Sequence, residues 1–288
     1  MDDLVRDLPE TARVLDLGAG GGSFGYGSTQ ARVIAVDLAF PAQTQPSLGK
    51  LIAMSQALPL KDARVDVVVC NHTLEHFENV RDALFEINRV IKTGGHLWAA
   101  IPNGFSFDDD LYRFIFSGGG HVNRFTLKSF IALVESNTQF RALSCKVLFS
   151  GFVYLRPPSP EKLPDYPPMA RLLGRIPKGV LETLLRWGNY SVRLSDRWLG
   201  SKMSRYGWGV VFRWEENPVS FRQSALERLQ IVPVDVNVCF SCGAGHPEAT
   251  LLDRLRRFIF WKKYNCPCCG TENIFFGGQL AREGRRPG

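Results

Sequence analysis

The sequence of 288 residues predicts an α/β domain built on a parallel sheet, followed by a small cysteine-rich module. Short apolar strands alternate with segments of helical periodicity, a pattern typical of a parallel sheet with helices on both faces. A glycine-rich turn, Gly18 to Gly22, directly follows the first of these strands. Five of the seven cysteines lie in the last fifth of the chain, which indicates the separate module.

Apolar runs and turn residues predict the elements in chain order. We expect strands at 12–17, 32–37, near 51–54, and at 65–70, 96–101, 141–154 and 206–214, with helices at 3–10, 78–92, 126–137 and within 169–203. The run from Val65 to Cys70 is almost continuously apolar, as expected for a strand buried on both faces. Thr93-Gly94-Gly95 is expected to end the helix before the fifth strand.

These elements predict the domain organisation. The first domain is expected to span 1–218, with a helical insertion at about 155–205, before its last strand, that opens in a proline-rich stretch. A linker at 219–234, a zinc ribbon at 235–280 and a tail at 281–288 are expected to follow.

The composition is that of a soluble globular protein, with 45% hydrophobic and 22% charged residues. The acidic start, Met1-Asp2-Asp3, lacks the basic region of a secretory signal, and no apolar run approaches the roughly 20 residues of a membrane span. Clustered cysteines favour a metal site over a disulfide framework. The expected compartment is therefore the cytoplasm.

Charge is unevenly distributed along the chain. Residues 1–110 contain 9 Lys and Arg against 15 Asp and Glu, whereas 111–218 contain 16 against 7 and 219–288 contain 10 against 6. A basic remainder can attract an anionic acceptor, RNA or a membrane surface by peripheral contact. The alternative is a basic surface that serves only solubility.

The glycine-rich turn and a second acidic residue predict a nucleoside site. A glycine turn after a strand brings backbone N–H groups close to a ligand without interference from Cβ atoms. Asp37 ends the second strand, where a carboxylate can accept both hydroxyls of a ribose. The alternatives are a tight turn without a ligand and a simple strand-end cap.

Four segments together resemble the class I S-adenosylmethionine-dependent methyltransferases, most closely the type 11 group, over roughly residues 10–155. They are the turn at 16–22, Asp37, the stretches Ala57-Leu58-Pro59-Leu60 and Asn71-His72-Thr73-Leu74-Glu75-His76, and Val90-Ile91-Lys92-Thr93-Gly94-Gly95. The last two stretches distinguish this group from dinucleotide-binding proteins. The resemblance implies a Rossmann-like sheet and S-adenosylmethionine as the cofactor.

The resemblance also implies which residues contact the cofactor. The methionine part would be bound by Asp16, Gly18, Ala19 and Gly20 with Gly22 completing the turn, the ribose by Asp37, the adenine by Leu38, Ala57 and Leu58, and the methyl-donor site by Asn71 and His72. The family often has an aspartate where this chain has Met54. Ser55, Gln56 or backbone groups would then have to bind the adenine amino group.

Three histidines are candidate catalytic residues, because an oxygen acceptor must lose a proton as it is methylated. His121 is the first candidate, since its His-x-x-Arg-Phe-Thr loop is similar to loops over the active site in type 11 proteins. His72 and His76 are the others. The alternatives are a loop hydrogen bond for His121 and a helix start for Glu75 and His76. The fourth strand does not end in Asn-Pro-Pro-Tyr, so oxygen is favoured over a base nitrogen.

The cysteines form two C-x2-C pairs separated by twenty-three residues. Cys239, Cys242, Cys266 and Cys269 can close a tetrahedral site, so the predicted zinc is structural. Cys268 is left over, and His246 is not needed as a ligand. Basic and aromatic residues between the pairs suggest either a patch for RNA or a helix that packs on the rest of the protein.

These observations favour an enzyme that O-methylates a small molecule or glycan. The first alternative is an RNA methyltransferase that uses the basic ribbon for docking, and the second is a non-catalytic scaffold. The sequence leaves open the acceptor, the methylated atom and the oligomeric state.

Overall fold

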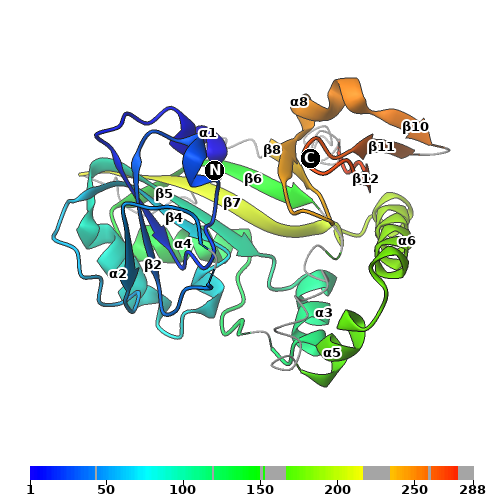
Figure 1. Ribbon diagram of the computed structural model, residues 1–288, viewed down its shortest axis with the longest axis horizontal. Helices are drawn as coiled ribbons and strands as arrows, with labels where there is room; N and C mark the ends of the chain where they lie inside the picture. The colour runs from blue at the N-terminus through cyan, green and yellow to red at the C-terminus, as the bar shows by residue number, and fades with distance from the viewer. Residues whose placement is uncertain are drawn as a thin grey trace, which may run out of the picture. The chain divides into compact units, whose positions relative to one another are not determined.

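The computed structural model describes residues 1–42, 44–118, 120–149, 152, 167–216, 234–258 and 261–277 (Figure 1). These residues form two compact units. Unit 1 consists of Met1–Pro102, Val122–Cys145 and Trp208–Val232, and unit 2 of Asn103–His121, Lys146–Gly207 and Pro233–Gly288. The predicted linker, the tail and the start of the helical insertion lie largely or wholly outside the described residues.

Unit 1 has an α/β fold, in which helices pack against a central β-sheet. Its elements are α1 (Asp2–Arg6), β1 (Arg13–Leu17), η1 (Tyr26–Ser28), β2 (Arg32–Asp37), β3 (Gly49–Ile52), β4 (Val65–Asn71), η2 (Leu74–His76), α2 (Val80–Val90), β5 (Ile91–Pro102), α4 (Leu127–Asn137) and most of β6 (Phe140–Phe149) and β7 (Arg205–Trp214). The strand order is β3-β2-β1-β4-β5-β7-β6. This is the Rossmann-like methyltransferase arrangement, which confirms the predicted fold class.

The parallel register brings three strand ends to one edge of the sheet. Strand β1 pairs with β2 through Leu17 and Val36, and with β4 through Asp16 and Val69. The residues that follow β1, β2 and β4 therefore meet at the carboxyl edge, where ligands of such sheets bind.

Alternating residues of the strands fill two cores, one on each face of the sheet. On β4, Val68 and Cys70 pack in one core and Val67 and Val69 in the other. The first core includes the apolar sides of α2 and α4. The second is covered by residues of α1 and of the loop between β1 and β2. Burial on both faces explains the continuous apolar run of this strand.

The strands of unit 1 lie within a few residues of their predicted ranges, but the end of α2 differs. Strand β5 begins at Ile91 and includes Thr93-Gly94-Gly95, so the prediction that these glycines end the helix is wrong. The carbonyls of Arg89 and Val90 accept hydrogen bonds from the amides of Ala63 and Arg64, which precede β4. Pairing with β4 therefore ends the helix before the glycines.

Unit 2 combines helices with small sheets. Its elements are α3 (Phe107–Ile115), α5 (Pro168–Gly174), α6 (Lys178–Trp198), β8 (Val234–Val238), β9 (Gly245–Pro247), α8 (Glu248–Leu251), η4 (Leu252–Arg254), β10 (Arg256–Phe258), β11 (Trp261–Asn265) and β12 (Glu272–Ile274). Residues 146–149 of β6 pair with β8, and β10, β11 and β12 form a separate sheet. Among the described residues, no helix is long and apolar enough to cross a membrane.

Two features of unit 2 differ from the sequence prediction. Helix α3 was not expected, although Ser106 caps it by accepting from the amide of Asp109 at 3.1 Å. A serine followed by acidic residues is a recognised start signal, so the sequence did contain it. The packing helix considered between the cysteine pairs is wrong for 256–258 and 261–265, which form the antiparallel pair β10–β11.

Candidate cofactor site and cysteine cluster

The glycine-rich turn after β1 is fixed against the end of β2 by backbone hydrogen bonds. The amides of Gly18 and Ala19 both donate to the carbonyl of Val36, at 2.8 and 3.1 Å. Gly18 has a φ of +70°, and a Cβ atom there would lie 2.1 Å from Cγ2 of Thr73. Only glycine therefore lets the chain turn this close to the segment after β4.

Asp16 is buried in unit 1 and stabilises the loop that continues the glycine-rich turn. Its Oδ2 atom accepts hydrogen bonds from the amide of Ser23 at 2.8 Å and from the hydroxyl of Tyr26 at 2.7 Å. Its Oδ1 atom is buried and accepts no hydrogen bond from a described residue. Burial raises the pKa of Asp16 above its ordinary value, although the bonds from Ser23 and Tyr26 oppose this shift. Asp16 therefore keeps one acceptor atom for a ligand.

The loop between β1 and β2 depends on a residue that the sequence analysis missed. Gln45 accepts from the amide of Tyr26 at 2.7 Å and donates to the carbonyl of Phe24 at 2.6 Å. It therefore holds the loop that presents Tyr26 to Asp16. Gln45 lies far along the chain in a stretch without a motif, so nothing in the single sequence marked it.

Asp37 joins the end of β2 to the glycine turn. Its Oδ2 atom accepts from the amide of Gly20 at 2.7 Å, and its Oδ1 atom accepts from the amide of Leu38 at 2.7 Å. Each carboxylate oxygen can accept more than one hydrogen bond. Oδ1 also accepts from the amide of Ala39 at 3.4 Å, so the Asp37 carboxylate can accept a further hydrogen bond while it holds the turn.

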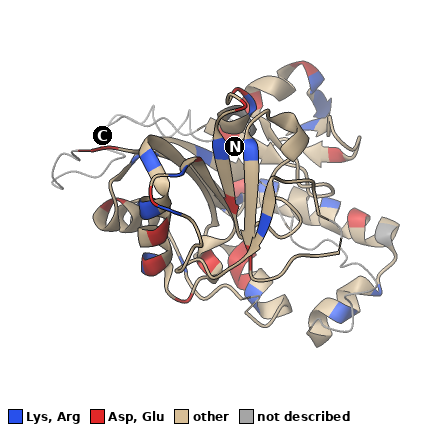
Figure 2. Ribbon diagram, turned by 60° about the vertical axis from the view of Figure 1, so that its left-hand side comes forward, with Lys and Arg blue, Asp and Glu red and all other residues tan. Residues whose placement is uncertain are grey.

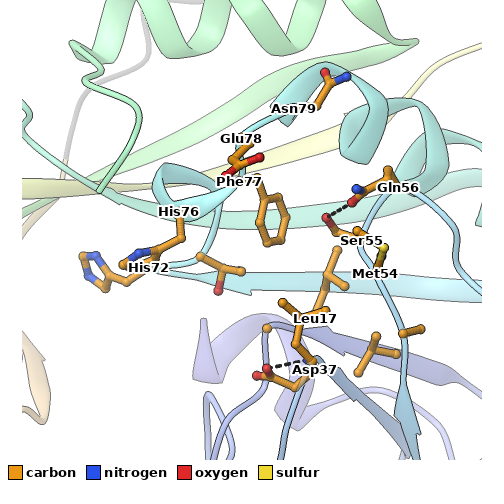
Figure 3. Close-up of a pocket in the computed structure, with 15 residues that line it drawn as sticks. Leu17, Asp37, Met54, Ser55, Gln56, His72, His76, Phe77, Glu78 and Asn79 are labelled. Atoms are coloured by element: carbon orange, nitrogen blue, oxygen red, sulfur yellow. Dashed lines mark hydrogen bonds between the residues drawn. The ribbon is translucent and has the colours of Figure 1, made fainter. Parts of the chain in front are cut away.

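A cavity of about 570 Å³ opens at this edge of the sheet (Figure 3). Of the predicted cofactor residues, Gly18, Asp37, Leu38 and His72 line it. Met54, Ser55 and Gln56 lie on the side opposite His72 and His76, and Ser55 bonds to Gln56 at 3.2 Å. A cavity of this volume is in the range of small-molecule and cofactor sites.

The other predicted cofactor residues do not line this cavity. Asp16, Ala19, Gly20 and Gly22 belong to the turn beside it, and Asn71 ends β4. Leu58 is buried in the core, and Ala57 is exposed next to it. Thr73, Phe77, Glu78 and Asn79 also line the cavity and were not predicted, although Thr73 lies within the stretch 71–76 and the other three follow it directly.

An ion-pair network stabilises the loop that follows Met54, Ser55 and Gln56, the residues on one side of the cavity. Arg89 donates to the carbonyls of Leu60 at 2.7 Å and Leu58 at 3.1 Å, and pairs with Glu86 and Asp62, each at 2.7 Å. Hydrogen bonding from Arg89 holds the pKa of Glu86 below its ordinary value. One side chain on α2 thereby orders the backbone at 58–62.

His72 and Glu75 form a pair beside the cavity. His72 has a φ of +53°, and its Nδ1 atom lies 3.5 Å from Oε1 of Glu75. Glu75 is fully buried, and its carboxylate accepts no hydrogen bond from a described residue. A buried carboxylate near Nδ1 favours the imidazole tautomer whose Nε2 atom can accept a proton. His76 also lines the cavity but is exposed.

His121 belongs to unit 2, where it is part of a different network. Its Nδ1 atom lies 2.9 Å from Oδ1 of Asp109, and its ring stacks on Tyr112 with centroids 4.4 Å apart. Arg113 pairs with the other oxygen of Asp109 at 2.6 Å and donates to the carbonyl of His121. Although burial opposes it, bonds from His121 and Arg113 hold the pKa of Asp109 below its ordinary value. The imidazole is therefore anchored to α3.

The four predicted cysteine ligands come together in unit 2. The sulfur atoms of Cys239, Cys242, Cys266 and Cys269 all lie within 4.8 Å of one another. The Sγ atoms of Cys239 and Cys269 are 3.7 Å apart, and those of Cys242 and Cys266 are 3.6 Å apart. Four sulfurs bound tetrahedrally at about 2.3 Å from one ion would be separated by about 3.8 Å. The cluster therefore fits a Zn²⁺ ion.

The two halves of the cluster have the same backbone turn. Gly243 donates to the carbonyl of Cys239 and Gly270 to that of Cys266, both at 2.8 Å. Both glycines have positive φ angles, +76° and +74°. This repeated turn places both sulfurs of each C-x2-C pair on the same side of the backbone.

Neighbouring side chains complete the cysteine cluster. Asn273 donates to Sγ of Cys239 at 3.3 Å, and Nε2 of His246 lies 3.3 Å from Sγ of Cys266. Burial raises the pKa of Cys269, but hydrogen bonds with Thr271 and with other thiols outweigh it and bring that pKa to about 6. Since metals bind the thiolate, this shift prepares Cys269 as a ligand. Cys268 is exposed and lies outside the group of four.

Comparisons with known proteins agree with the sheet and its turn. Residues 15–99 match the family described as "Methyltransferase domain". Malonyl-acyl-carrier protein O-methyltransferase of Methylococcus capsulatus is 34% identical over 32% of this chain and 38% of that protein. The enzyme of the same name from Pseudescherichia vulneris is 36% identical over 29% of this chain and 36% of that protein.

A solved structure, the SAM-dependent methyltransferase from Archaeoglobus fulgidus, has a TM-score of 0.47 and 15% sequence identity, and the match covers 73% of this chain and 88% of that one. The chain spans less than two fifths of the length of the two curated relatives. The family match identifies residues 15–99 as a methyltransferase domain.

Proposed function

We propose that the whole chain is an S-adenosylmethionine-dependent methyltransferase that acts on an oxygen of a small molecule or glycan. The observation that carries this proposal is the cavity of unit 1, where the glycine turn and the Asp37 carboxylate meet within the matched region. When bound, S-adenosylmethionine supplies an electrophilic methyl group. The chain's own task is then to orient both reactants, exclude water and accept a proton.

The cofactor would be bound by the residues at the carboxyl edge of the sheet. The free Oδ1 atom of Asp16 and the backbone amides of the turn suit an amino acid moiety, which carries both donors and acceptors. Asp37 suits a ribose, because its carboxylate can accept a further hydrogen bond while it holds the turn. Ser55 and Gln56 are the polar groups available for adenine in place of the aspartate that Met54 replaces. We retain Leu38, Ala57, Leu58 and Asn71 in the proposal as neighbours of the adenine and methyl-donor positions.

His72 is the group that we propose as proton acceptor for the acceptor hydroxyl. It lines the cavity, and its Nδ1 atom lies 3.5 Å from the buried Glu75 carboxylate, which favours the tautomer that accepts a proton at Nε2. His76, which also lines the cavity, is a second candidate. For His121 we propose a smaller role, that of holding its own loop in place, because its Nδ1 atom is already hydrogen-bonded to Asp109.

Glu75→Gln tests this assignment. The substitution replaces the carboxylate next to the Nδ1 atom of His72 with an amide of almost the same size, so kcat should fall while the affinity for S-adenosylhomocysteine is retained. A matched control is Glu78→Gln, at an exposed acid on the same cavity, which should retain both kcat and affinity. An unchanged kcat in Glu75→Gln would remove Glu75 from the mechanism.

The first experiment on the function follows labelled methyl from S-adenosylmethionine into a fractionated cell extract. Label in small molecules or glycans is the expected result. Label in RNA would favour the alternative below. If no fraction is labelled and S-adenosylhomocysteine does not bind in a calorimetric titration, the chain is instead the scaffold considered from the sequence.

An RNA acceptor is the second candidate, and one observation favours it. Arg254, Arg256, Arg257 and Lys262 are all exposed on η4 and the β10–β11 pair of unit 2. RNA binding through basic side chains weakens steeply as salt concentration rises. A flat salt dependence of transfer would argue against it.

For the cysteine cluster we propose a structural Zn²⁺ in a ribbon at about 235–280. Four sulfur ligands leave no position open for a substrate. The ion would stabilise a region of unit 2 whose own core, around Leu251, Tyr264 and Phe275, is small.

A further inference from the structure

Helix α6 of unit 2 has two apolar faces, and only one of them is buried. Leu181, Leu185 and Val192 lie in the interior of unit 2. A second set recurs at spacings of four, three, seven and four residues, which places it on one other face of the helix. It consists of Val180, Leu184, Trp187, Leu194 and Trp198, whose exposed fractions lie between 43% and 71%.

Helix α5, which packs on α6, also exposes large apolar side chains. Its Ala170 is buried in the same cluster as Leu181 and Leu185, which packs α5 against α6. Met169 and Leu172 remain exposed, by 41% and 57%. We call the seven exposed residues of the two helices the α5–α6 stripe. Soluble proteins rarely expose so many large apolar side chains together unless the surface binds something.

The exposed charges of the segment that carries the α5–α6 stripe are of one sign. Between 167 and 205, the exposed charged residues among those whose burial is described are Arg171, Arg175, Arg197 and Lys202. The only acids in that range are Glu182, which is half-buried, and Asp196, which is buried. Figure 2 marks the acidic and basic residues along the ribbon.

Internal bonds occupy the one buried acid of this region. Asp196 accepts from the hydroxyl of Ser201 at 2.6 Å and from the amide of Met203 at 2.8 Å. Unit 2 as a whole contains 20 Lys and Arg against 12 Asp and Glu, a formal charge of +8. An occupant of the stripe must therefore be apolar at its centre and anionic at its margin.

We propose that the α5–α6 stripe docks unit 2 on the surface of an anionic lipid bilayer, with α6 lying in the plane of the interface. A helix of 21 residues with an apolar face and basic neighbours has the character of an interfacial helix, and tryptophan prefers the headgroup region. Aliphatic Val180, Leu184 and Leu194 offer no stacking platform for RNA bases. A second copy would bring two units of the same positive charge together.

Flotation of the full-length protein with vesicles tests the proposal. Binding is expected to phosphatidylcholine vesicles that contain phosphatidylglycerol and to fall sharply for phosphatidylcholine alone. The variant Trp187→Gln/Trp198→Gln should lose about tenfold or more of this binding, because both interfacial anchors are gone. The variant Arg171→Gln/Arg175→Gln should lose about fivefold for each charge removed.

A matched control separates lipid docking from general effects of exposed apolar residues. Phe85, on α2 of unit 1, is 52% exposed, and Phe85→Gln should leave vesicle binding unchanged. All substituted positions are exposed, so circular dichroism and zinc content should equal those of the wild type. Tryptophan emission should shift to the blue with anionic vesicles, and the double tryptophan variant should lose that shift.

Three outcomes would overturn the proposal. The first is no binding to anionic vesicles at low salt, or binding that the tryptophan variant retains in full. The second is a stable dimer that the tryptophan variant converts to monomers, because the stripe would then join two copies. The third is unchanged vesicle binding with altered methyl transfer to a soluble acceptor, which would assign the stripe to the catalytic site.

Discussion

The cofactor cavity of unit 1 and the cysteine cluster of unit 2 use similar glycine turns for different kinds of site. In unit 1, Gly20 gives its amide to the Asp37 carboxylate, so the turn is satisfied by the protein itself. In unit 2, Gly243 and Gly270 bring four sulfurs within 4.8 Å of one another. Four thiolates at that distance repel unless a cation lies between them. The first site can therefore fold before it binds, whereas we expect the second to need the proposed Zn²⁺ ion in order to fold.

The largest expected effect tests this difference directly. Cys242→Ser should abolish zinc binding and unfold the ribbon, since binding of structural zinc contributes on the order of 10 kcal/mol to the folding of such modules. The affinity of unit 1 for S-adenosylhomocysteine should remain. Zinc stoichiometry and calorimetric titration measure the two properties on one sample.

Cys268→Ser is the control for that variant, because Cys268 is exposed and lies outside the group of four. It should retain full zinc. Full zinc in Cys242→Ser, or loss of zinc in Cys268→Ser, would show that the ligand set is wrong.

The next effect concerns the backbone of the cofactor site. Gly18→Ala places a Cβ atom 2.1 Å from Thr73 at a positive φ, so the turn must move. We expect a loss of about 1–3 kcal/mol in the free energy of unfolding, and weaker cofactor binding. Gly25→Ala, where no atom lies within 4 Å, should have much less effect in the same denaturation experiment. Equal stabilities of the two variants would contradict the close approach.

Asp37→Ala should act on binding more than on folding. Hydrogen bonds to a charged acceptor contribute about 1.5–3 kcal/mol, so affinity for S-adenosylhomocysteine should fall by an order of magnitude or more. The lost bond to Gly20 should add a smaller decrease in stability. An unchanged calorimetric titration would remove Asp37 from the cofactor site.

The smallest effect is a dependence of stability on pH. The pKa of Glu86 is held below its ordinary value, mainly by Arg89. A carboxyl group with a lowered folded-state pKa stabilises the protein above its unfolded pKa of about 4.3, and this stabilisation is lost as pH falls through the folded value. Arg89→Met should therefore be less stable than wild type by about 1–2 kcal/mol at neutral pH. The difference should shrink below about pH 4, as measured by chemical denaturation.

The elements and motifs whose chemistry is local could be predicted from the sequence. A few neighbouring residues are enough to explain each of three features: the apolar strands, the glycine turn with Asp16 and Asp37, and each C-x2-C pair. For this reason the strand positions of unit 1 and the grouping of the four cysteines were predictable. Even the unexpected α3 had a local signal at Ser106, which the analysis overlooked.

Which of these residues share a site depends on the folded arrangement of distant segments. It placed Thr73 against Gly18, fixed Tyr26 through Gln45 and buried Glu75 near His72. It also assigned His121 to Asp109 in unit 2 and left one apolar face of α6 exposed. These contacts join residues that lie far apart in the chain or depend on burial in the folded protein. Neither distant contacts nor burial of this kind produce a periodic pattern in a single sequence.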